Sequence, residues 1–425
     1  MMLNVSSRLL RKALSIYNRQ VVAQSCTTTG TRSSVYVHWP YCEKRCTYCN
    51  FNKYISNNVD HKRMTKCLVQ ELKAVLNETG VSQITTVFFG GGTPNLMRPA
   101  DVESVLQHIL PLMPTICPEI SLECNPKSEA KQQLRDFKSS GISRISIGLQ
   151  SLSDVDLKLL GRMHTTRDAI NFVEAAEELF PGRTSVDVIY GRPGQALKQW
   201  EEELQKILQL GLSHLSLYEL TVERGTQLFK DISSGKQSLP PQEVRSEMYI
   251  SAVEVLENAG LHRYEVSNFA KKGHECVHNQ RYWEGKQYIG IGPGAHSRLD
   301  FPGHREARVQ TLEPIPWMRD VETKGHGTRL VRRQTTSDRL GEMLMLGMRT
   351  AVGISNEDWT KVPGARSLTD TFQGSATVQG YIRDGFLRLN ESLLQTTNVG
   401  MNVADGITSS LLPLVMQGEG DDQKK

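Results

Sequence analysis

The sequence predicts an α/β fold, in which six parallel strands form an open three-quarter barrel with helices outside and a smaller C-terminal α+β domain follows. Short β-type runs alternate regularly with helical stretches through the first half of the chain. There are six such units, whereas a closed barrel of this kind has eight. Distinctive polar or glycine-rich motifs stand at or near the ends of these runs, where barrel proteins place their chemistry.

Six runs have the composition of strands, because they are short, rich in apolar residues and in several cases stopped by glycine-containing turns. They are Val35–Trp39, Ile84–Phe89, Glu119–Cys124, Arg144–Gly148, Thr184–Tyr190 and His214–Tyr218. Since helices separate them, we expect them to pair in parallel.

The stretches between the strands predict helices. Val59–Asn77 is amphipathic, with apolar residues on one side at Met64, Cys67, Leu68, Leu72, Val75 and Leu76. Further helices are expected at Pro99–Leu110, Ser128–Ser140, Thr166–Leu179 and Gln195–Leu210.

The chain is 425 residues long, enough for two domains. A further helix is expected at Pro241–Ala259, and the composition changes near Phe301, where prolines and basic residues mark a connection. We therefore predict a partial barrel with its extension in residues 33–300 and an accessory domain in residues 301–417, which contains a helix at Ser337–Arg349. Residues 418–425 are expected to be a disordered tail.

The net charge of +4 is concentrated at the N-terminus. Residues 1–42 hold five basic residues and no acidic one, so the remainder carries −1. The body of the protein is therefore close to neutral, which argues against a general affinity for nucleic acid. No apolar run approaches the roughly eighteen residues of a membrane span, so no transmembrane segment is expected.

The N-terminal residues 1–32 have the character of a mitochondrial transit peptide, because Arg, Ser and Leu recur with helical spacing and acidic residues are absent. The alternative is an ordinary basic helix on the protein surface. Five of the eight cysteines are scattered, which argues against a secreted disulfide framework. Both observations fit a mitochondrial location.

The other three cysteines, Cys42, Cys46 and Cys49, follow the first strand at spacing C-x3-C-x2-C. Thiolates suit iron–sulfur clusters, and three of them hold three corners of a cubane while the fourth iron stays open. Two alternatives remain at this point. One is a zinc site, for which His38 is the available fourth ligand although it lies inside the strand. The other is a disulfide with a spare thiol.

With the aromatic Tyr48 directly before the third cysteine, the motif resembles the radical S-adenosylmethionine (SAM) superfamily. The resemblance implies a [4Fe-4S] cluster on Cys42, Cys46 and Cys49, whose open iron chelates the amino and carboxylate groups of SAM. It also implies one-electron cleavage of SAM to a 5′-deoxyadenosyl radical, with the protein positioning the cofactor.

The loop Gly90-Gly91-Gly92-Thr93-Pro94 lacks side chains over three positions, so that its backbone can approach a ligand closely. After the second strand of such a barrel it resembles the loop that contacts the SAM amino group. By that resemblance Gly91, Gly92 and Thr93 belong to the SAM site.

Four further settings resemble the oxygen-independent coproporphyrinogen III oxidase family and its close relatives. They are Glu123 in Glu-Cys-Asn-Pro, Gln150 in Ile-Gly-Leu-Gln-Ser, Arg162 in Leu-Gly-Arg-Met-His and Asp187 in Asp-Val-Ile-Tyr-Gly-Arg-Pro-Gly. The resemblance, which runs from about Tyr36 to His296, implies that these four residues bind SAM with Tyr36 and Tyr48 beside it. Acids and amides suit the ribose hydroxyls and the ammonium, and Arg162 suits the carboxylate.

This family has two branches, the oxidase and a haem chaperone that hands haem to membrane haem proteins. Phe51 occupies the position of a fourth cysteine of the oxidase branch, and a presequence replaces its ordered N-terminal arm. His278-Asn279-Gln-Arg-Tyr282-Trp283 matches the H-N-x-x-Y-W signature of the chaperone branch. The resemblance therefore implies a haem carrier with haem as cargo and a haem protein, such as one of the respiratory chain, as acceptor.

His278 is the candidate haem ligand, because imidazole is a natural axial ligand of haem iron. Cys276 is a second candidate ligand. The alternative is that His278 has only a structural role at the open side of the barrel. Three functions remain open: a haem carrier, an oxidative decarboxylase of coproporphyrinogen III, and a degenerate scaffold. The haem acceptor, the cleavage of SAM in the working cycle and the oligomeric state are not fixed by the sequence.

Overall fold

A computed structural model of the chain describes residues 31–56, 58–114, 118–127 and 130–416. The predicted transit peptide therefore lies outside the described residues, except for Thr31 and Arg32, which begin the first strand. The predicted disordered tail at 418–425 also lies outside them.

All six predicted strands are present. They are β1 (Thr31–Trp39), β4 (Val81–Gly91), β5 (Glu119–Cys124), β6 (Arg144–Gln150), β7 (Thr184–Tyr190) and β8 (His214–Glu219). The strands lie in this order in one sheet, and β4 through β8 pair in parallel. The predicted α/β class with a parallel-dominated sheet is confirmed.

The sheet extends beyond these six strands on both sides. Beside β1 it continues through β11 (Tyr288–Ile291), β12 (His296–Phe301), β13 (His304–Gln310) and β14 (Thr328–Arg333). Beside β8 it continues through β10 (Asn268–Ala270) and β9 (His262–Glu265). Because β14 and β9 end the sheet without pairing with each other, the barrel is open.

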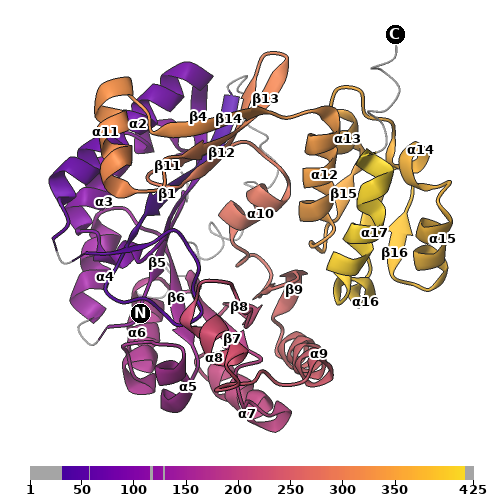
Figure 1. Ribbon diagram of the computed structural model, residues 1–425, viewed down its shortest axis with the longest axis horizontal. Coiled ribbons are helices and arrows are strands. Elements are labelled where there is room, and N and C mark those ends of the chain that lie inside the picture. The colour runs from indigo at the N-terminus through magenta and orange to yellow at the C-terminus, as the bar shows by residue number, and fades with distance from the viewer. Residues whose placement is uncertain (1–30, 57, 115–117, 128–129, 417–425) are drawn as a thin grey trace, which may run out of the picture. The chain divides into compact units, whose positions relative to one another are not determined.

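Helices α2, α3, α4 and α6 follow one another around the outside of the sheet (Figure 1). The helices of this part of the chain are α2 (His61–Thr79), α3 (Pro99–Leu106), α4 (Ala130–Ser139), α5 (Asp154–Leu159), α6 (Thr166–Leu179), α7 (Leu197–Leu208), α8 (Gln227–Ser233), α9 (Gln242–Asn258), α10 (Val277–Trp283) and α11 (Pro314–Lys324). In α2 the Asp60 side chain accepts from the Arg63 backbone at the start, and Gly80 ends the helix at φ 63°. Its buried face includes Met64, Leu68 and Leu72.

The C-terminal domain has its own hydrophobic core, which begins at Leu340. Its elements are α12 (Thr336–Gly347), β15 (Ile354–Ser355), α13 (Asn356–Thr360), α14 (Leu368–Phe372), α15 (Ala376–Arg383), β16 (Leu387–Leu389), β17 (Leu393–Thr396), α16 (Asn398–Met401) and α17 (Ala404–Met416). Its three strands form a separate antiparallel sheet in the order β15-β17-β16.

The division predicted at residue 300 differs from this arrangement, because it cuts β12 and assigns β13 and β14 to the accessory domain. Those strands continue the barrel sheet. We therefore propose that the C-terminal domain begins after β14. It is tied to the barrel by ion pairs of Arg349 with Glu265 at 3.0 Å and of Arg298 with Glu342 at 2.7 Å.

A buried ion pair closes the turn between β7 and α7. The Arg192 guanidinium contacts the Glu203 carboxylate and donates to the backbone oxygen of Ile189 at 2.6 Å. The other Glu203 oxygen accepts from the Ser151 hydroxyl at 2.7 Å, on the loop after β6. Arg192 therefore holds the C-terminal ends of two neighbouring strands in place.

Replacing Arg192 with Met is expected to destabilise the fold by roughly 3–5 kcal/mol, because it leaves the Glu203 carboxylate buried without its charged partner. Lys236→Ala is the control, since it removes an ion pair with Asp231 in which the lysine side chain is 69% exposed. That control should cost less than about 1 kcal/mol. Urea unfolding measures both changes, and equal losses would contradict the structural role of Arg192.

Candidate functional site

The cysteine loop is held between the end of β1 and two other loops. Cys42 lies in the short strand β2 (Tyr41–Cys42), which pairs in parallel with β3 (Tyr54–Ile55) across the loop. The backbone of Gly92 donates to Trp39 at 2.7 Å, and that of Thr93 donates to Tyr41 at 2.9 Å. On the opposite side the Thr47 backbone donates to Leu160 at 3.1 Å. The loop is therefore fixed at its start and at its middle.

All three cysteines of this loop are free thiols. The Thr93 hydroxyl donates to Cys42 Sγ at 3.2 Å, and Arg162 Nη1 approaches Cys46 Sγ at 3.5 Å. Burial raises the pKa of the Cys42 thiol; the Thr93 hydrogen bond opposes this, and Cys46 and Cys49 add to it. Cys46 and Cys49 therefore lie near enough to Cys42 to affect the pKa of its thiol.

His38 is not placed to complete a zinc site. Its Nδ1 lies 3.2 Å from the Tyr36 hydroxyl, and its Nε2 lies 3.0 Å from the backbone oxygen of Asn52. Among the described residues, no three Cys, His, Asp or Glu side chains converge on a point where one metal ion would bind. Thiolates of a cubane cluster each bind a different iron, so they have no need to converge in this way.

The glycine loop after β4 requires its glycines. Gly91 has φ 112°, and a Cβ there would lie 2.6 Å from the His38 ring. A Cβ on Gly92 would lie 2.8 Å from the Tyr41 backbone oxygen. Side chains are therefore excluded where this loop passes the cysteine loop.

Arg162 links the cysteine loop to the ends of β5 and β6. Its Nη2 donates to Asn125 Oδ1 at 2.6 Å and to the Gly148 backbone oxygen at 2.9 Å. Asn125 in turn donates to the Thr93 hydroxyl at 3.0 Å. Asn125 was not among the candidates from the sequence, although its place directly after β5 and before Pro126 was a usable signal.

Two half-buried acids face the inside of the barrel. Burial, together with the Asp187 carboxylate, raises the pKa of Glu123 to about 8, against a hydrogen bond from the Gly91 backbone at 3.1 Å. Burial also raises the pKa of Asp187 to about 6, although the Ser146 hydroxyl donates to it at 3.3 Å. Burial, aided by Glu123, raises the pKa of Tyr36 well above its usual value. Both acids can therefore exchange a proton near neutral pH.

Gln150 is the one non-glycine residue with positive φ, 65°, in the part of the chain that the structure describes. The pairing of β6 with β7 shifts register directly before it. Arg192 Nη1 donates to its backbone oxygen at 3.4 Å, which supports this conformation. Such conformations cost on the order of 1–3 kcal/mol and are concentrated at functional sites.

Tyr48 completes the group beside the third cysteine. Burial raises its pKa, while the Arg162 guanidinium opposes the rise. Direct contacts thus join Arg162 to Cys46, Thr93 to Cys42, and Glu123 to Gly91. Phe51, in the position of the absent fourth cysteine, is 67% exposed.

His278 lies apart from the cysteine loop. It is 7% exposed on α10, with Nδ1 2.9 Å from the Thr86 hydroxyl and its ring 5.1 Å from that of Phe88. Burial, with the charge of Arg281, lowers the pKa of His278 to about 3. The second candidate ligand, Cys276, is also buried, and burial with the nearby Glu119 raises its pKa to about 12. His278 is thus neutral and Cys276 protonated in this arrangement.

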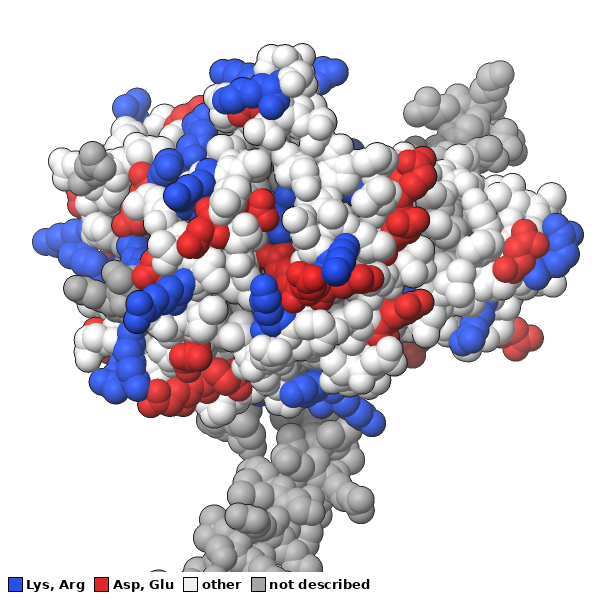
Figure 2. Space-filling model, turned by 90° about the horizontal axis from the view of Figure 1, so that it is seen from below, with Lys and Arg blue, Asp and Glu red and all other residues white. Residues whose placement is uncertain are grey.

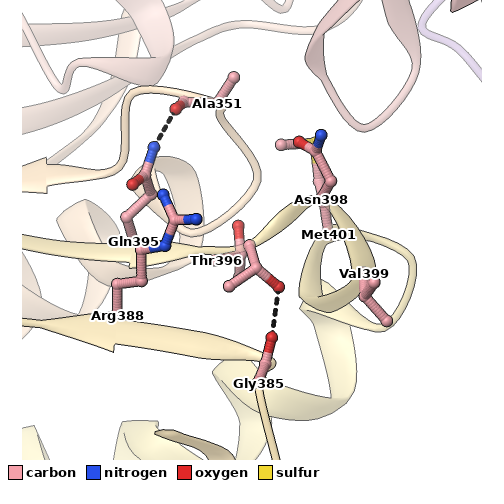
Figure 3. Close-up of a pocket in the computed structure, with 9 residues that line it drawn as sticks. Ala351, Gly385, Arg388, Gln395, Thr396, Asn398, Val399 and Met401 are labelled. Atoms are coloured by element: carbon pink, nitrogen blue, oxygen red, sulfur yellow. Dashed lines mark hydrogen bonds between the residues drawn. The ribbon is translucent and has the colours of Figure 1, made fainter.

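A pocket of about 360 Å³ lies in the C-terminal domain. Figure 3 shows that the Gln395 side chain bonds to the Ala351 backbone there. The Thr397 hydroxyl donates to the Gly385 backbone oxygen at 2.7 Å. Arg388 lies on the pocket wall. Among the described residues, no buried polar side-chain atom of the lining lacks a partner.

The charges on the surface are mixed. On the face seen in Figure 2, basic side chains occur singly or in small groups among acidic ones. None of the described helices has the length and apolar character that crossing a membrane requires.

Comparisons with known proteins show the family to which the chain belongs. A model of the Radical SAM superfamily matches residues 36–207, and a model of the HemN C-terminal domain matches residues 334–403. In sequence, the chain is 43% identical over 405 residues to the Danio rerio "Radical S-adenosyl methionine domain-containing protein 1, mitochondrial", covering 94% of this chain and 91% of that protein. It is 32% identical to the "Heme chaperone HemW" of Bacillus subtilis (strain 168), and the match covers 89% of this chain and 99% of that protein.

Among solved structures, the chain resembles "Coproporphyrinogen III oxidase (HemN) from Escherichia coli is a Radical SAM enzyme" at 19% identity and a TM-score of 0.75, over 92% of each chain. The partial barrel with its cysteine loop is thus of the radical SAM class. The chain belongs to the radical SAM superfamily and, within it, to the family of the radical SAM domain-containing protein 1.

Membership of the radical SAM superfamily implies that the protein binds a [4Fe-4S] cluster and SAM as cofactors. The residues present fit them, because three free thiols share one loop and the glycine cradle beside them excludes side chains. The predicted mitochondrial location is confirmed by the names of the relatives from Danio rerio and Mus musculus.

Glu123→Gln is expected to change the pH dependence of stability. The pKa of a glutamate in the unfolded chain is about 4.3, whereas the pKa of Glu123 in the folded chain is about 8. Between these values the unfolded chain has released a proton that the folded chain keeps, so wild-type stability falls as pH rises. The free energy of unfolding of the variant, relative to that of wild type, should therefore rise by a few kcal/mol from pH 5 to pH 8.

Urea unfolding of the cluster-free protein at both pH values measures this change. The control is Asp168→Asn, because hydrogen bonds from Thr165 lower the pKa of this exposed acid. The contribution of the Asp168 carboxylate to stability is lost only below pH 5. The change in the free energy of unfolding caused by Asp168→Asn should therefore be the same at pH 5 and pH 8. A Glu123→Gln effect that is equally independent of pH would show that the Glu123 carboxyl is not protonated.

Proposed function

We propose that this protein is a haem chaperone, which binds haem and delivers it to haem proteins. The observation that carries the proposal is the alignment with the haem chaperone of Bacillus subtilis, which spans 99% of that protein. Phe51 supports it, because the fourth cysteine of the oxidase branch is absent.

We propose that the [4Fe-4S] cluster is held by Cys42, Cys46 and Cys49. The Thr93 hydroxyl and the Arg162 guanidinium would stabilise the thiolates through their contacts with Cys42 and Cys46. The cluster, when reduced, supplies one electron to SAM.

The proposed SAM site lies beside the cysteine loop that would hold the cluster. Its members share a position at or near the C-terminal end of a strand or on the adjoining loops, and they are Tyr36, Tyr48, Gly91, Gly92, Thr93, Glu123, Gln150, Arg162 and Asp187. Arg162 offers the charge for the carboxylate, and Glu123 and Asp187 offer acceptors for the ammonium or the ribose. Asn125 positions Arg162 and Thr93 relative to each other.

His278 remains the proposed haem ligand of the family signature, with a condition that its burial imposes. The neutral imidazole is the form that binds iron. Its Nδ1 is engaged with Thr86, so that Nε2 is the atom left for iron, and α10 would have to shift to expose it. Cys276 is the weaker candidate, because its protonated thiol lies 3.6 Å from Glu119.

The acceptor is proposed to be a haem protein, for which the respiratory chain is the natural source in a mitochondrion. The competing function is oxidative decarboxylation of coproporphyrinogen III. That activity would consume the porphyrinogen and release 5′-deoxyadenosine, whereas a carrier binds haem without turnover.

An anaerobic haem titration of the cluster-reconstituted protein, followed by the Soret band, tests the proposal. Saturable and stoichiometric binding is the expected result. If haem does not bind, and if porphyrinogen is consumed with release of 5′-deoxyadenosine, the haem-carrier hypothesis is rejected in favour of the oxidase.

Cys46→Ala is expected to abolish the cluster, because two thiolates remain where three irons need ligands. Haem binding should be retained, since His278 lies on a different element. Iron and sulfide analysis and the Soret titration measure the two properties separately. Cys67→Ala is the matched control, because this buried cysteine lies on α2 and should leave the cluster content unchanged. Survival of the cluster in Cys46→Ala would disprove the ligand assignment.

A further inference from the structure

A small cavity of about 50 Å³ lies inside the barrel, and Asp187 of the proposed SAM site is part of its lining. It is lined from β4 through β8 and from the segment that contains α10, by Phe88, Ser121, Arg144, Ser146, Ser185, Asp187, His214, Ser216, Tyr218, Cys276 and Asn279. Tyr218 is 43% exposed and marks the open end of this cavity, whereas Arg144 and His214 begin their strands and mark its inner end.

Strand register explains why the cavity is polar. Side chains two apart on a strand share a face, so Arg144 and Ser146 both point inward, as do Ser185 and Asp187. Across the strands Ser146 is paired with Ser185, and Ser185 with His214. Barrel interiors are ordinarily filled by branched apolar residues, so this polar lining needs an explanation.

Two donors in the lining lack a partner. Arg144 is 2% exposed; its Nη2 donates to the His274 backbone oxygen at 3.0 Å, while its Nη1 has no hydrogen bond. Ser121 is 1% exposed, pairs in register with Arg144, and its hydroxyl is also without a partner. The nearest acid, Glu119, has an unpartnered Oε2 3.9 Å from Nη1, beyond hydrogen-bond distance. Arg144 Nη1 therefore has only this loose ion pair and the Ser121 hydroxyl has no partner, whereas buried donors are ordinarily satisfied by a hydrogen bond.

The charges around the inner end leave room for one negative group. Glu119 lies between Arg144 and Arg183, 3.6 Å from the latter, so these three groups sum to one positive charge. His214 adds none, because burial lowers its pKa and its ring nitrogens contact the hydroxyls of Ser185 and Tyr264, each at 2.6 Å. The opposing acid, Asp187, lies toward the other end of the cavity.

We propose that this cavity receives a carboxylate side chain of the bound tetrapyrrole, with Arg144 Nη1 and the Ser121 hydroxyl as its donors. The inference rests on the proposed function, because haem carries propionate side chains of the required chemistry. The cavity has room for a carboxylate, which is comparable in size to a few water molecules, but not for the macrocycle. The macrocycle therefore stays at the mouth, near Tyr218. The competing occupant is ordered water alone.

The test compares haem with haem dimethyl ester, whose propionates are blocked, by Soret titration of the full cluster-reconstituted chain. Wild type should bind haem about 10–100-fold more tightly than the ester, the range expected for hydrogen bonds to a charged group. Arg144→Gln should bring the two affinities within about twofold by weakening haem alone. Ser121→Ala should reduce the preference partially.

Lys236→Ala is the control, because it removes an exposed ion pair with Asp231 and neither residue lines the cavity, so it should keep the preference. Circular dichroism and cluster content establish that each variant is folded. If Arg144→Gln does not fold, the comparison of haem with its ester is made with Ser121→Ala alone. Equal binding of haem and ester by wild type, or a preference unchanged in both cavity variants, would leave water as the occupant and overturn the inference. Failure of wild type to bind either compound would instead refute the proposed function and with it the need for this site.

Discussion

The site depends on one constraint, which is that the cysteine loop must hold three thiols beside a backbone that carries no side chains. Two hydrogen bonds, from Gly92 to Trp39 and from Thr93 to Tyr41, fasten the glycine loop across the end of β1. The same glycine loop supplies the Thr93 hydroxyl to Cys42. Because a Cβ at Gly91 or Gly92 would collide with His38 or with the Tyr41 backbone, this close approach sets the distance between strands β1 and β4 at their carboxyl ends.

The sequence predicted the six parallel strands and the cysteine loop because both have strong local patterns. It did not predict the outer strands, since β13 (His304–Gln310) and β14 (Thr328–Arg333) are rich in arginine and lack an apolar alternation. Their attachment to the rest of the barrel includes contacts remote in sequence, such as the ion pair of Arg308 with Glu78 on α2 at 2.6 Å. Asn125 was missed for a similar reason, because its function becomes visible only where Arg162 and Thr93 meet it.

Arg192 illustrates how a motif can be distinctive without touching a cofactor. It stands in the Gly-Arg-Pro-Gly turn after β7, yet it is buried against Glu203 and the Ile189 backbone. Its contact with the Gln150 backbone supports the positive φ of that residue. The turn therefore contributes to the proposed SAM site through the backbone of its neighbour, which a reading of side-chain chemistry alone does not reveal.

The family signature on α10 gains a physical meaning from Glu119, which is connected to two regions of the molecule. One carboxylate oxygen accepts from the His278 backbone at 2.7 Å and lies near the Cys276 thiol, while the other faces Arg144 and Arg183. The start of α10 and the inner end of the polar cavity thus share one buried acid. A change in charge beside Arg144 acts on the carboxylate that holds α10, and exposure of His278 requires α10 to leave that carboxylate. The proposed haem ligand and the proposed carboxylate site are therefore linked through Glu119 rather than independent.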